Sequence, residues 1–466
     1  MPVFQKTLLS DRFFVIVTIM KTFALKTLGC KVNQYESQQI GHVFEQAGLT
    51  PARSGEPADI VVVNTCCVTH IASSKSRRAI RQATAKNPHA PLIVTGCLPI
   101  GQMDELNDLD DNCLIITDKT HFSATLNQIL SSHNTDCRTQ NHSKPSLSCK
   151  IKHKTENIQS TDSTDPESLP LLKSYAGRSR AFLKVQDGCD AYCTYCIIPK
   201  IRTKVCSKDV KNILQEARDL IAAGHNEIVL TGIFLGAYGQ TTARRKRWDP
   251  AYRDSLAEMV AQVAALPGLA RLRLSSLEPS DVTERLLEVF KQYPTLMPHL
   301  HLPLQSGSGR ILKRMARQYT IGQFMDVVDR AKSVLDRPAI TTDIIVGFPG
   351  ETEEDFEQTL DISRRVEFSK IHSFSFSVRK NTPAALLEPK VPAAVIRDRS
   401  DRLHALDQQL QIQFRRQFLG QTVEVIVEHI RPPKGRCERY FMVDIGSLPD
   451  AAKLKKGQRV RLVLRD

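Results

Sequence analysis

Apolar and polar positions follow two different spacings in the first part of the chain. Short apolar runs predict four buried strands, at residues 21–28, 60–63, 91–95 and 114–116. Between them, apolar residues spaced for one helical face predict a helix that begins at the cap Asn33 and stops at Gly48, and residues 72–86 predict a second helix. The alternation predicts an α/β domain with a parallel βαβ sheet over residues 21–130.

From Phe182 onward the spacing repeats as one strand followed by room for one helix. Six expected strands begin near residues 182, 227, 271, 299, 340 and 370. A (βα)6 repeat closes into a full or partial parallel barrel, with its active site at the carboxyl ends of the strands. We therefore expect a partial TIM-like barrel over residues 173–405.

The remaining segments differ in character. Residues 131–172 are polar, with few apolar side chains, and are expected to form a linker. Near the C-terminus, alternating residues predict strands in a small β-barrel assigned to residues 406–466. Residues 421–466 contain ten Lys or Arg against six Asp or Glu. This balance favours nucleic-acid binding, and an ordinary solvated surface is the alternative.

Composition narrows the class of protein. The chain has 466 residues, 41% of them hydrophobic, and a net charge of +14, which is typical of a soluble protein with two or three domains and a polyanionic partner. No apolar run approaches the roughly 20 residues that span a bilayer. Residues 1–19 are expected to be an extension upstream of the true start. Twelve clustered cysteines indicate metal binding in a reducing compartment, the cytoplasm.

Three cysteines lie in one short run, Cys189, Cys193 and Cys196, directly after the first expected barrel strand. A CxxxCxxC spacing suits a [4Fe–4S] cluster, because three thiolates hold three irons and leave the fourth open to a ligand that is not protein. The alternative is a zinc site or a set of structural thiols, although zinc motifs usually add a second, distant pair of ligands.

A second set of three cysteines is spread over the N-terminal domain. Cys30, Cys66 and Cys97 each follow an expected strand by a few residues. The carboxyl ends of parallel strands lie side by side, so we expect these thiols to converge on one point. Cys67 should point away from Cys66, which leaves Cys66 as the expected ligand. Three ordinary buried cysteines are the alternative.

Several motifs together resemble the radical S-adenosylmethionine (SAM) methylthiotransferases. They are residues 27–36 (TLGCKVNQYE), 64–66 (NTC), 96–97 (GC), the cysteine loop 186–199, 275–279 (SSLEP), 303–308 (PLQSGS) and 347–352 (GFPGET). TLGCKVNQYE is most similar to the branch that modifies N6-threonylcarbamoyladenosine at tRNA position 37. The branch specific for isopentenyladenosine tends to show YGCQMN, and the branch acting on a ribosomal-protein aspartate tends to show LGCPKN.

The resemblance implies an enzyme with two [4Fe–4S] clusters and SAM. Cys189, Cys193 and Cys196 would bind the cluster that cleaves SAM, and Cys30, Cys66 and Cys97 an auxiliary cluster that carries sulfur. The reaction would add a methylthio group to C2 of the modified adenosine, with the tRNA anticodon loop, an electron donor and a sulfur donor as partners and no membrane. The C-terminal unit would be a TRAM domain. Isopentenyladenosine, a ribosomal protein, or an iron–sulfur RNA-binding protein without turnover are the alternatives.

The resemblance also suggests SAM contacts, each placed just after a barrel strand: Tyr195, Gly232, Glu278, Gln305 and Gly347. His299 and His301 share one face of a strand and are expected to form a hydrogen-bonding pair inside the barrel, not a metal site. The chain departs from the family after Arg202, where Thr203 follows in place of Gly. Cys67 and Cys206 receive no role.

Overall fold

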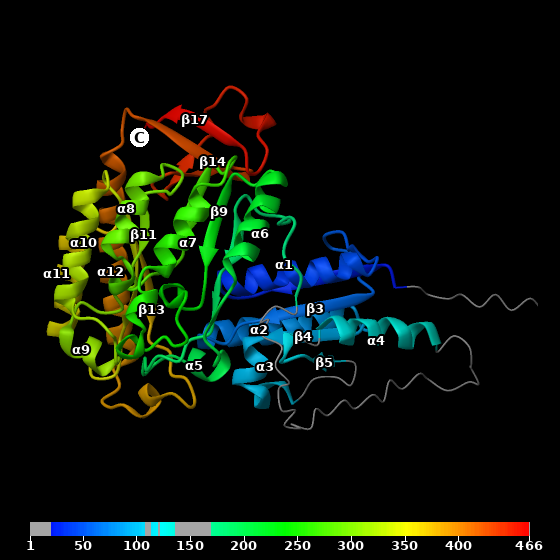
Figure 1. Cartoon of the computed structure of the whole chain (residues 1–466). Coiled ribbons are helices and arrows are strands. Elements are labelled where there is room, and N and C mark those ends of the chain that lie inside the picture. Colours follow the sequence, from blue (N-terminus) through cyan, green and yellow to red (C-terminus); the bar gives the residue numbers. More distant parts are fainter. Residues whose placement is uncertain (1–19, 108–112, 120–121, 136–168, 466) are drawn as a thin grey trace, which may run out of the picture.

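The computed structural model describes residues 20–107, 113–119, 122–135 and 169–465. The expected extension at 1–19 and most of the expected linker lie outside these residues. Figure 1 shows three units: an N-terminal unit in blue and cyan, a central barrel in green to orange, and a small C-terminal sheet, largely red, that sits across one end of the barrel.

The N-terminal unit is a parallel sheet of strand order β2-β1-β3-β4-β5. Its elements are β1 (Thr22–Thr27), α1 (Lys31–Gln46), β2 (Thr50–Pro51), β3 (Ile60–Thr65), α2 (His70–Lys86), β4 (Leu92–Gly96), α3 (Cys97–Gly101), β5 (Cys113–Ile115) and α4 (Phe122–Thr135). Ile60 and Val62 pack with α1 and α4, and Val61 and Val63 pack with α2 and α3. Strand β3 is buried throughout because both faces of the sheet are covered, and its first four residues are apolar.

The start of α1 differs from the expected cap. The helix begins at Lys31, so Asn33 lies inside its first turn and is fully buried. Asn33 Nδ2 donates to the carbonyl oxygens of Leu28 at 2.9 Å and Thr65 at 2.8 Å. The predicted cap is wrong because this amide joins the chain after β1 to the end of β3. Gly48, with a φ of +86°, follows the helix as predicted.

The central unit contains the six predicted parallel strands. They are β6 (Ala181–Lys184), β9 (Glu227–Thr231), β10 (Arg271–Leu274), β11 (His299–His301), β12 (Ala339–Val346) and β13 (Lys370–Ser375). Two three-stranded sheets, β10-β9-β6 and β11-β12-β13, are joined by bridges Leu272↔Leu296 and Ser276↔His301. Within this fully described unit β6 and β13 are not paired with each other, so the barrel is partial, as predicted.

Helices cover the outside of this barrel. They are α6 (Val210–Ala222), α7 (Ser255–Ala264), α8 (Glu284–Gln292), α9 (Gly309–Arg314), α10 (Ile321–Val334), α11 (Glu353–Val366) and α12 (Ala393–Arg416). The expected boundary between residues 405 and 406 falls inside α12. Leu406 and Leu410 pack in the barrel core, whereas Phe414 packs in the C-terminal core. One helix therefore belongs to both units.

The C-terminal unit is an antiparallel sheet of strand order β16-β15-β14-β17. Its strands are β14 (Thr422–Ile430), β15 (Pro433–Cys437), β16 (Met442–Asp444) and β17 (Arg459–Val463). The all-β unit was predicted, but β15 was not, because its sequence, PKGRC, has no apolar alternation. Arg271 and Arg273 of β10 donate to the carbonyl oxygens of Arg436 at 3.2 Å and Cys437 at 2.8 Å. These bonds fix the sheet against the barrel.

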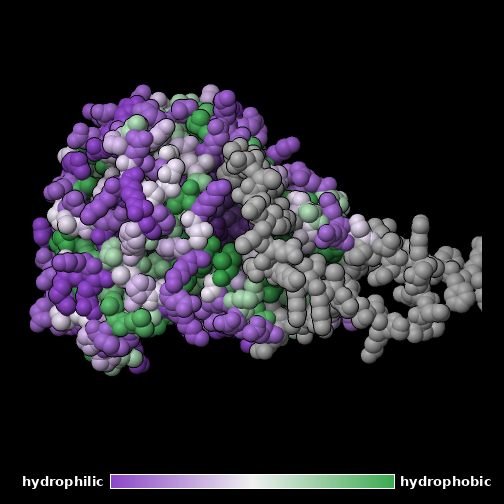
Figure 2. Space-filling model, turned by 60° about the horizontal axis from the view of Figure 1, so that its bottom comes forward, coloured by the Kyte–Doolittle hydropathy of each residue, from purple (hydrophilic) through white to green (hydrophobic). Residues whose placement is uncertain are grey.

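Figure 2 shows hydrophilic side chains over most of the face it presents, with smaller hydrophobic patches between them. Among the helices in the described ranges, none combines the length and apolar character needed to cross a membrane.

Candidate functional site

Cys30, Cys66 and Cys97 meet at the carboxyl edge of the N-terminal sheet. They follow β1, β3 and β4, which are neighbours in that sheet. Cys66 and Cys97 are buried and Cys30 is exposed. Burial raises the pKa of the Cys66 thiol to about 11, and the nearby Cys97 and Cys30 add to the rise. The structure thus brings the three thiols together, while their role as ligands stays a prediction.

The neighbours of these cysteines show how close the strands come. Gly29 has a φ of +110°, and a Cβ there would lie 2.9 Å from Cys66 Cβ. Cys67 is buried in the core against α2 and α3 and approaches the carbonyl oxygen of Cys97 at 3.2 Å. Cys67 lies in the same apolar cluster as Cys97, and the choice of Cys66 over Cys67 as the ligand stays a prediction.

The second set of cysteines lies in the loop after β6. Burial raises the pKa values of Cys189 and Cys196 to about 12, and Cys193 raises both further by its proximity. The loop is fixed by the bond from the Cys189 amide to the Arg202 carbonyl oxygen, 3.0 Å long. Cys206 lies in β8 (Cys206–Ser207), a two-residue strand that pairs with β7 (Gln186–Asp187), outside this set.

Arg317 links the cysteine loop to Glu278. Its Nη1 donates to Cys193 Sγ at 3.1 Å, and its Nη2 lies 2.7 Å from Glu278 Oε1. Arg317 Nε is buried and has no hydrogen-bond partner among the described atoms. Arg245 pairs with the other oxygen of Glu278 at 3.1 Å. Sequence reasoning missed Arg317 because nothing in its neighbourhood has a motif spacing.

The other expected SAM contacts have protein neighbours of their own. Tyr195 packs edge-on against Phe348, with 6.5 Å between ring centroids. A Cβ at Gly232 would meet Gln186, and one at Gly347 would meet Ile396 of α12. Gln305 has a φ of +61° and follows β11. The structure therefore explains both glycines by close packing, and the five residues stay predictions as SAM contacts.

A buried ion-pair network joins the two sets of cysteines. Glu36 of α1 lies 2.8 Å from Arg202 Nη1 and 3.6 Å from Lys184 Nζ, and it also pairs with Lys119. Arg202 also contacts Asp187 at 2.9 Å. Burial alone would raise the pKa of Glu36, but these cations hold it well below its usual range. Arg202, placed directly after the cysteine loop, is therefore anchored to the N-terminal unit.

Arg379, in the loop after β13, reaches from the barrel into the N-terminal unit. Its Nη1 donates to Ser73 Oγ at 3.2 Å, and Cys66 and Cys67 act on it electrostatically. The side chain is 4% exposed, and its Nε and Nη2 have no partner among the described atoms. Two buried donors next to a cysteine set are the kind of group that a bound anion satisfies.

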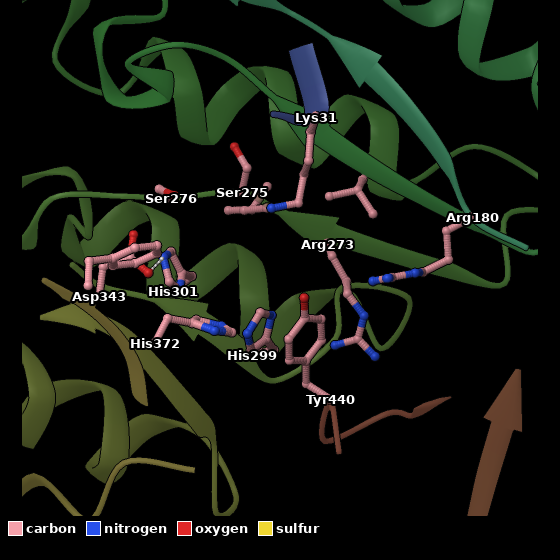
Figure 3. A pocket seen from close by; sticks show the side chains of 13 residues that line it. Lys31, Arg180, Arg273, Ser275, Ser276, His299, His301, Asp343, His372 and Tyr440 are labelled. Carbon is pink, nitrogen blue, oxygen red and sulfur yellow. Dashed lines mark ion pairs between the residues drawn. The ribbon is translucent and has the colours of Figure 1, made fainter. Parts of the chain in front are cut away.

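Residues from all three units line one pocket of about 250 Å³ (Figure 3). Lys31 enters from the start of α1 and Tyr440 from the turn between β15 and β16, and the barrel strands and the residues next to their ends supply the rest. His299 and His301 both bond Thr341 Oγ1, at 3.0 and 2.9 Å, so the predicted hydrogen-bonding pair is confirmed. This pocket was not predicted, because its residues come from distant segments.

Two family models match the chain, the radical SAM superfamily at residues 183–362 and uncharacterized protein family UPF0004 at residues 22–117. A threonylcarbamoyladenosine tRNA methylthiotransferase MtaB from Chlamydia pneumoniae is 37% identical over 89% of each chain. The protein of that name from Thermotoga maritima is 37% identical over 88% of this chain and 87% of its own. The chain belongs to the radical SAM methylthiotransferase family.

Other relatives in this methylthiotransferase family carry a different name. A tRNA-2-methylthio-N(6)-dimethylallyladenosine synthase from Mycobacteroides abscessus is 35% identical over 88% of this chain and 77% of its own. Among solved structures, the radical SAM methyltransferase TsrM from Kitasatospora setae has a TM-score of 0.52 at 14% identity, covering 79% of this chain and 74% of that one. This likeness concerns the fold alone.

The radical SAM methylthiotransferase assignment implies a [4Fe–4S] cluster and SAM. The cysteine loop fits a cluster, because its three thiols gather after the first barrel strand, as in an active site of this architecture. The raised pKa values of Cys189 and Cys196 keep these two thiols protonated unless a metal replaces the protons. The Arg317 N–H group directed at Cys193 Sγ suits a sulfur that carries negative charge.

Proposed function

We propose that this enzyme replaces the hydrogen on C2 of N6-threonylcarbamoyladenosine, at position 37 of tRNA, with a methylthio group. The observation that carries this choice is the polar lining of the pocket in Figure 3, which includes Lys31, His301 and Asp343. Identity alone does not decide between the two named activities, because it is 37% for one and 35% for the other. An apolar isopentenyl group would leave buried polar groups unpaired, which is costly.

We assign the two sets of cysteines to two clusters. The cluster that binds SAM would be held by Cys189, Cys193 and Cys196. The auxiliary cluster would be held by Cys30, Cys66 and Cys97. When bound, the clusters and SAM would remove the hydrogen from C2 and provide a sulfur that bears a methyl group. No side-chain acid or base can perform this chemistry. The unpartnered N–H groups of Arg379 beside Cys66 support the second assignment.

The chain's own residues position and shield the reacting groups. Arg317 and Arg379 bring one guanidinium to each set of cysteines, where N–H donors stabilise negative charge on sulfur. The network around Glu36 fixes the N-terminal unit against the cysteine loop. Holding two reacting centres in a fixed relation converts an encounter into an intramolecular step and excludes water.

Among the proposed SAM contacts, Glu278 has the strongest support. Its carboxylate is held between Arg317 and Arg245, and Arg317 also contacts Cys193. Tyr195, Gly232, Gln305 and Gly347 remain in the proposal as groups that shape the same strand ends.

Basic side chains on two units support tRNA binding. Lys75, Arg78 and Arg81 lie exposed along α2 of the N-terminal unit. Lys455 and Arg461 are exposed on the C-terminal sheet, and the chain as a whole carries a net charge of +14. Such surfaces attract the phosphates of the anticodon stem and loop. An electron donor, a sulfur donor and a cytoplasmic location complete the proposal.

Nucleoside mass spectrometry of tRNA tests the proposed function. Deleting the gene in its host should remove 2-methylthio-N6-threonylcarbamoyladenosine and leave the unmethylthiolated nucleoside. Complementation with the wild-type gene should restore it, and complementation with Cys193→Ala should not. Loss of the isopentenyl derivative instead would move the enzyme to the other tRNA branch. An unchanged nucleoside profile would leave the ribosomal-protein or non-enzymatic reading.

A further inference from the structure

The pocket in Figure 3 is built for a small polar group. Its volume of about 250 Å³ is below the roughly 300–1,000 Å³ of pockets for drug-sized ligands, so it suits a substituent on a base better than a whole nucleotide. Phe374 lines the same pocket and is 44% exposed, which offers an aromatic face to a purine ring. The pocket therefore has an aromatic opening and a polar interior.

Most of the cations around the pocket already have partners. Arg273 Nε donates to Glu227 at 3.0 Å and its Nη2 to the Cys437 carbonyl oxygen at 2.8 Å. Arg180 pairs with Glu428 at 3.0 Å. The Lys31 ammonium group, in contrast, has no hydrogen bond or ion pair with any residue in the described part of the chain. Its ammonium group is the free positive charge of the pocket lining.

Neutral and negative groups complete the lining. Asp343 lies 3.4 Å from His301. Burial raises the pKa of Asp343, but the contact with His301 and the charges of His372 and Lys31 outweigh it and hold this pKa below its usual range. Burial lowers the pKa of His299, so its ring is neutral. Ser275 Oγ and His299 Nδ1 are buried without a hydrogen-bond partner among the described atoms. The pocket therefore presents one free cation, one carboxylate and two unsatisfied polar atoms.

A metal ion is a less suitable occupant. His301, Asp343 and His372 offer three ligand atoms within 4.8 Å of one another, on neighbouring strands. Lys31 acts electrostatically on Asp343, and its charge opposes a second cation there. His301 Nδ1 is already bonded to Thr341.

We infer that Lys31 binds the carboxylate of the threonyl group and that Asp343 accepts a hydrogen bond from its N–H or O–H groups. This inference rests on the proposed function and names the residue that reads the substituent. The threonylcarbamoyl group carries a carboxylate, a hydroxyl and urea N–H groups, which match the free cation, the carboxylate and the unsatisfied atoms of the pocket. A site built to bond polar groups rejects an analogue that lacks them far more strongly than an apolar pocket rejects an added methylene.

The position of Lys31 connects recognition of the threonyl carboxylate to the N-terminal cysteines. Lys31 directly follows Cys30 and begins α1, whose burial against the sheet fixes its direction. A carboxylate held by Lys31 would therefore set the distance between the base and the N-terminal cysteines. A substituent that does not engage Lys31 would leave the base free to shift within the pocket.

Binding of two matched RNAs tests the inference. The probes are an anticodon stem-loop with N6-threonylcarbamoyladenosine at position 37 and the same RNA with the threonyl carboxylate converted to an amide. Equilibrium anisotropy titrations use the anaerobically reconstituted enzyme, its Lys31→Met and Lys31→Gln variants, and Lys211→Met, a control that removes an exposed charge on α6. Wild type should prefer the carboxylate by about 10- to 100-fold. Both Lys31 variants should bind the two RNAs equally, and Lys211→Met should keep the preference.

The outcomes separate this inference from the proposed function. If wild type methylthiolates the threonylcarbamoyl RNA but Lys31→Met keeps the full preference for the carboxylate, the reading of Lys31 is wrong and the proposed function stands. If wild type converts only isopentenyladenosine RNA, the proposed function itself fails. One zinc ion per chain that is lost in Asp343→Asn and displaced by RNA would overturn the inference in favour of a metal site. Each variant should retain wild-type iron, which confirms that Cys30 is undisturbed.

Discussion

The two sets of cysteines are brought together in two different ways. Cys189, Cys193 and Cys196 lie in one loop, so their spacing alone brings them together. Cys30, Cys66 and Cys97 come from three strand ends and meet only because β1, β3 and β4 are neighbours in a parallel sheet. Each set has a buried arginine from elsewhere in the barrel unit, Arg317 or Arg379. A local motif can be recognised from the sequence alone, whereas a site assembled from separate strands can be recognised only once the order of the strands in the sheet is known.

The largest contrast should appear when one cysteine of each set is removed. Cys193→Ala is expected to abolish the reductive cleavage of SAM, because an open iron can no longer be held in the barrel. Cys66→Ala is expected to keep SAM cleavage but to yield no methylthiolated RNA. The measurement is liquid chromatography of SAM cleavage products and of the RNA nucleosides in the same reaction.

Cys67→Ala is the matched control, because Cys67 neighbours Cys66 in sequence and is not assigned as a ligand. It should retain both activities. Loss of methylthiolation in Cys67→Ala and not in Cys66→Ala would exchange their assigned roles.

The next largest effect is on stability. It tests how strongly the set Cys30, Cys66 and Cys97 depends on the packing of the N-terminal unit against the barrel. Glu36→Ala removes the buried carboxylate that Arg202, Lys119 and Lys184 share. Breaking a buried ion pair on one side costs about 3–5 kcal/mol, so the urea midpoint of unfolding should fall clearly. Glu45→Ala, an exposed change on the same helix, should leave the midpoint almost unchanged. Equal midpoints in the two variants would show that the network is not what fixes the units together.

The same network has a pH signature. Burial would raise the pKa of Glu36, but Arg202, Lys119 and Lys184 lower it well below its ordinary value of about 4.3. A carboxyl whose pKa falls on folding adds stability above its unfolded pKa and loses it as the pH falls through the folded pKa. The midpoint difference between wild type and Glu36→Gln should therefore be constant from about pH 8 to 5 and shrink below about pH 4.3. A difference that disappears near neutral pH would argue against this assignment of charge.

The smallest effect is a shift in reduction potential when either Arg379 or Arg317 is replaced. Arg379→Met should lower the reduction potential of a cluster at the N-terminal set by about 60–120 mV, the value of one charge-assisted hydrogen bond. Arg317→Met should do the same at the barrel set, and each change should leave the other potential nearly unchanged. Redox titration followed by electron paramagnetic resonance measures both. Equal shifts at both sites from either variant would mean that the arginines act through the fold, not through contact.

The sequence was sufficient for features that depend on local spacing. The six barrel strands, the parallel N-terminal sheet, the cysteine loop and the pair His299 and His301 were all predicted from such spacing. Convergence of Cys30, Cys66 and Cys97 was also predictable, because parallel strands end at a common edge.

Features that depend on contacts between distant segments were not predictable. Arg379 bonds Ser73 across 306 residues of sequence, and Lys31 meets the barrel histidines only once the units are packed. Asn33 has the sequence of a helix cap but is used to join two strand ends. In each case a local preference is overridden by a tertiary contact that satisfies a buried polar group.

Iron content, read together with Mössbauer spectra, tests the central claim most directly. The claim is that the strand-end cysteines hold a second cluster of the same kind as the cysteine loop. Anaerobically reconstituted wild type should contain about eight irons per chain, all in [4Fe–4S] clusters, and both Cys66→Ala and Cys193→Ala should contain about four. About four irons in wild type, with no change in Cys66→Ala, would contradict the account.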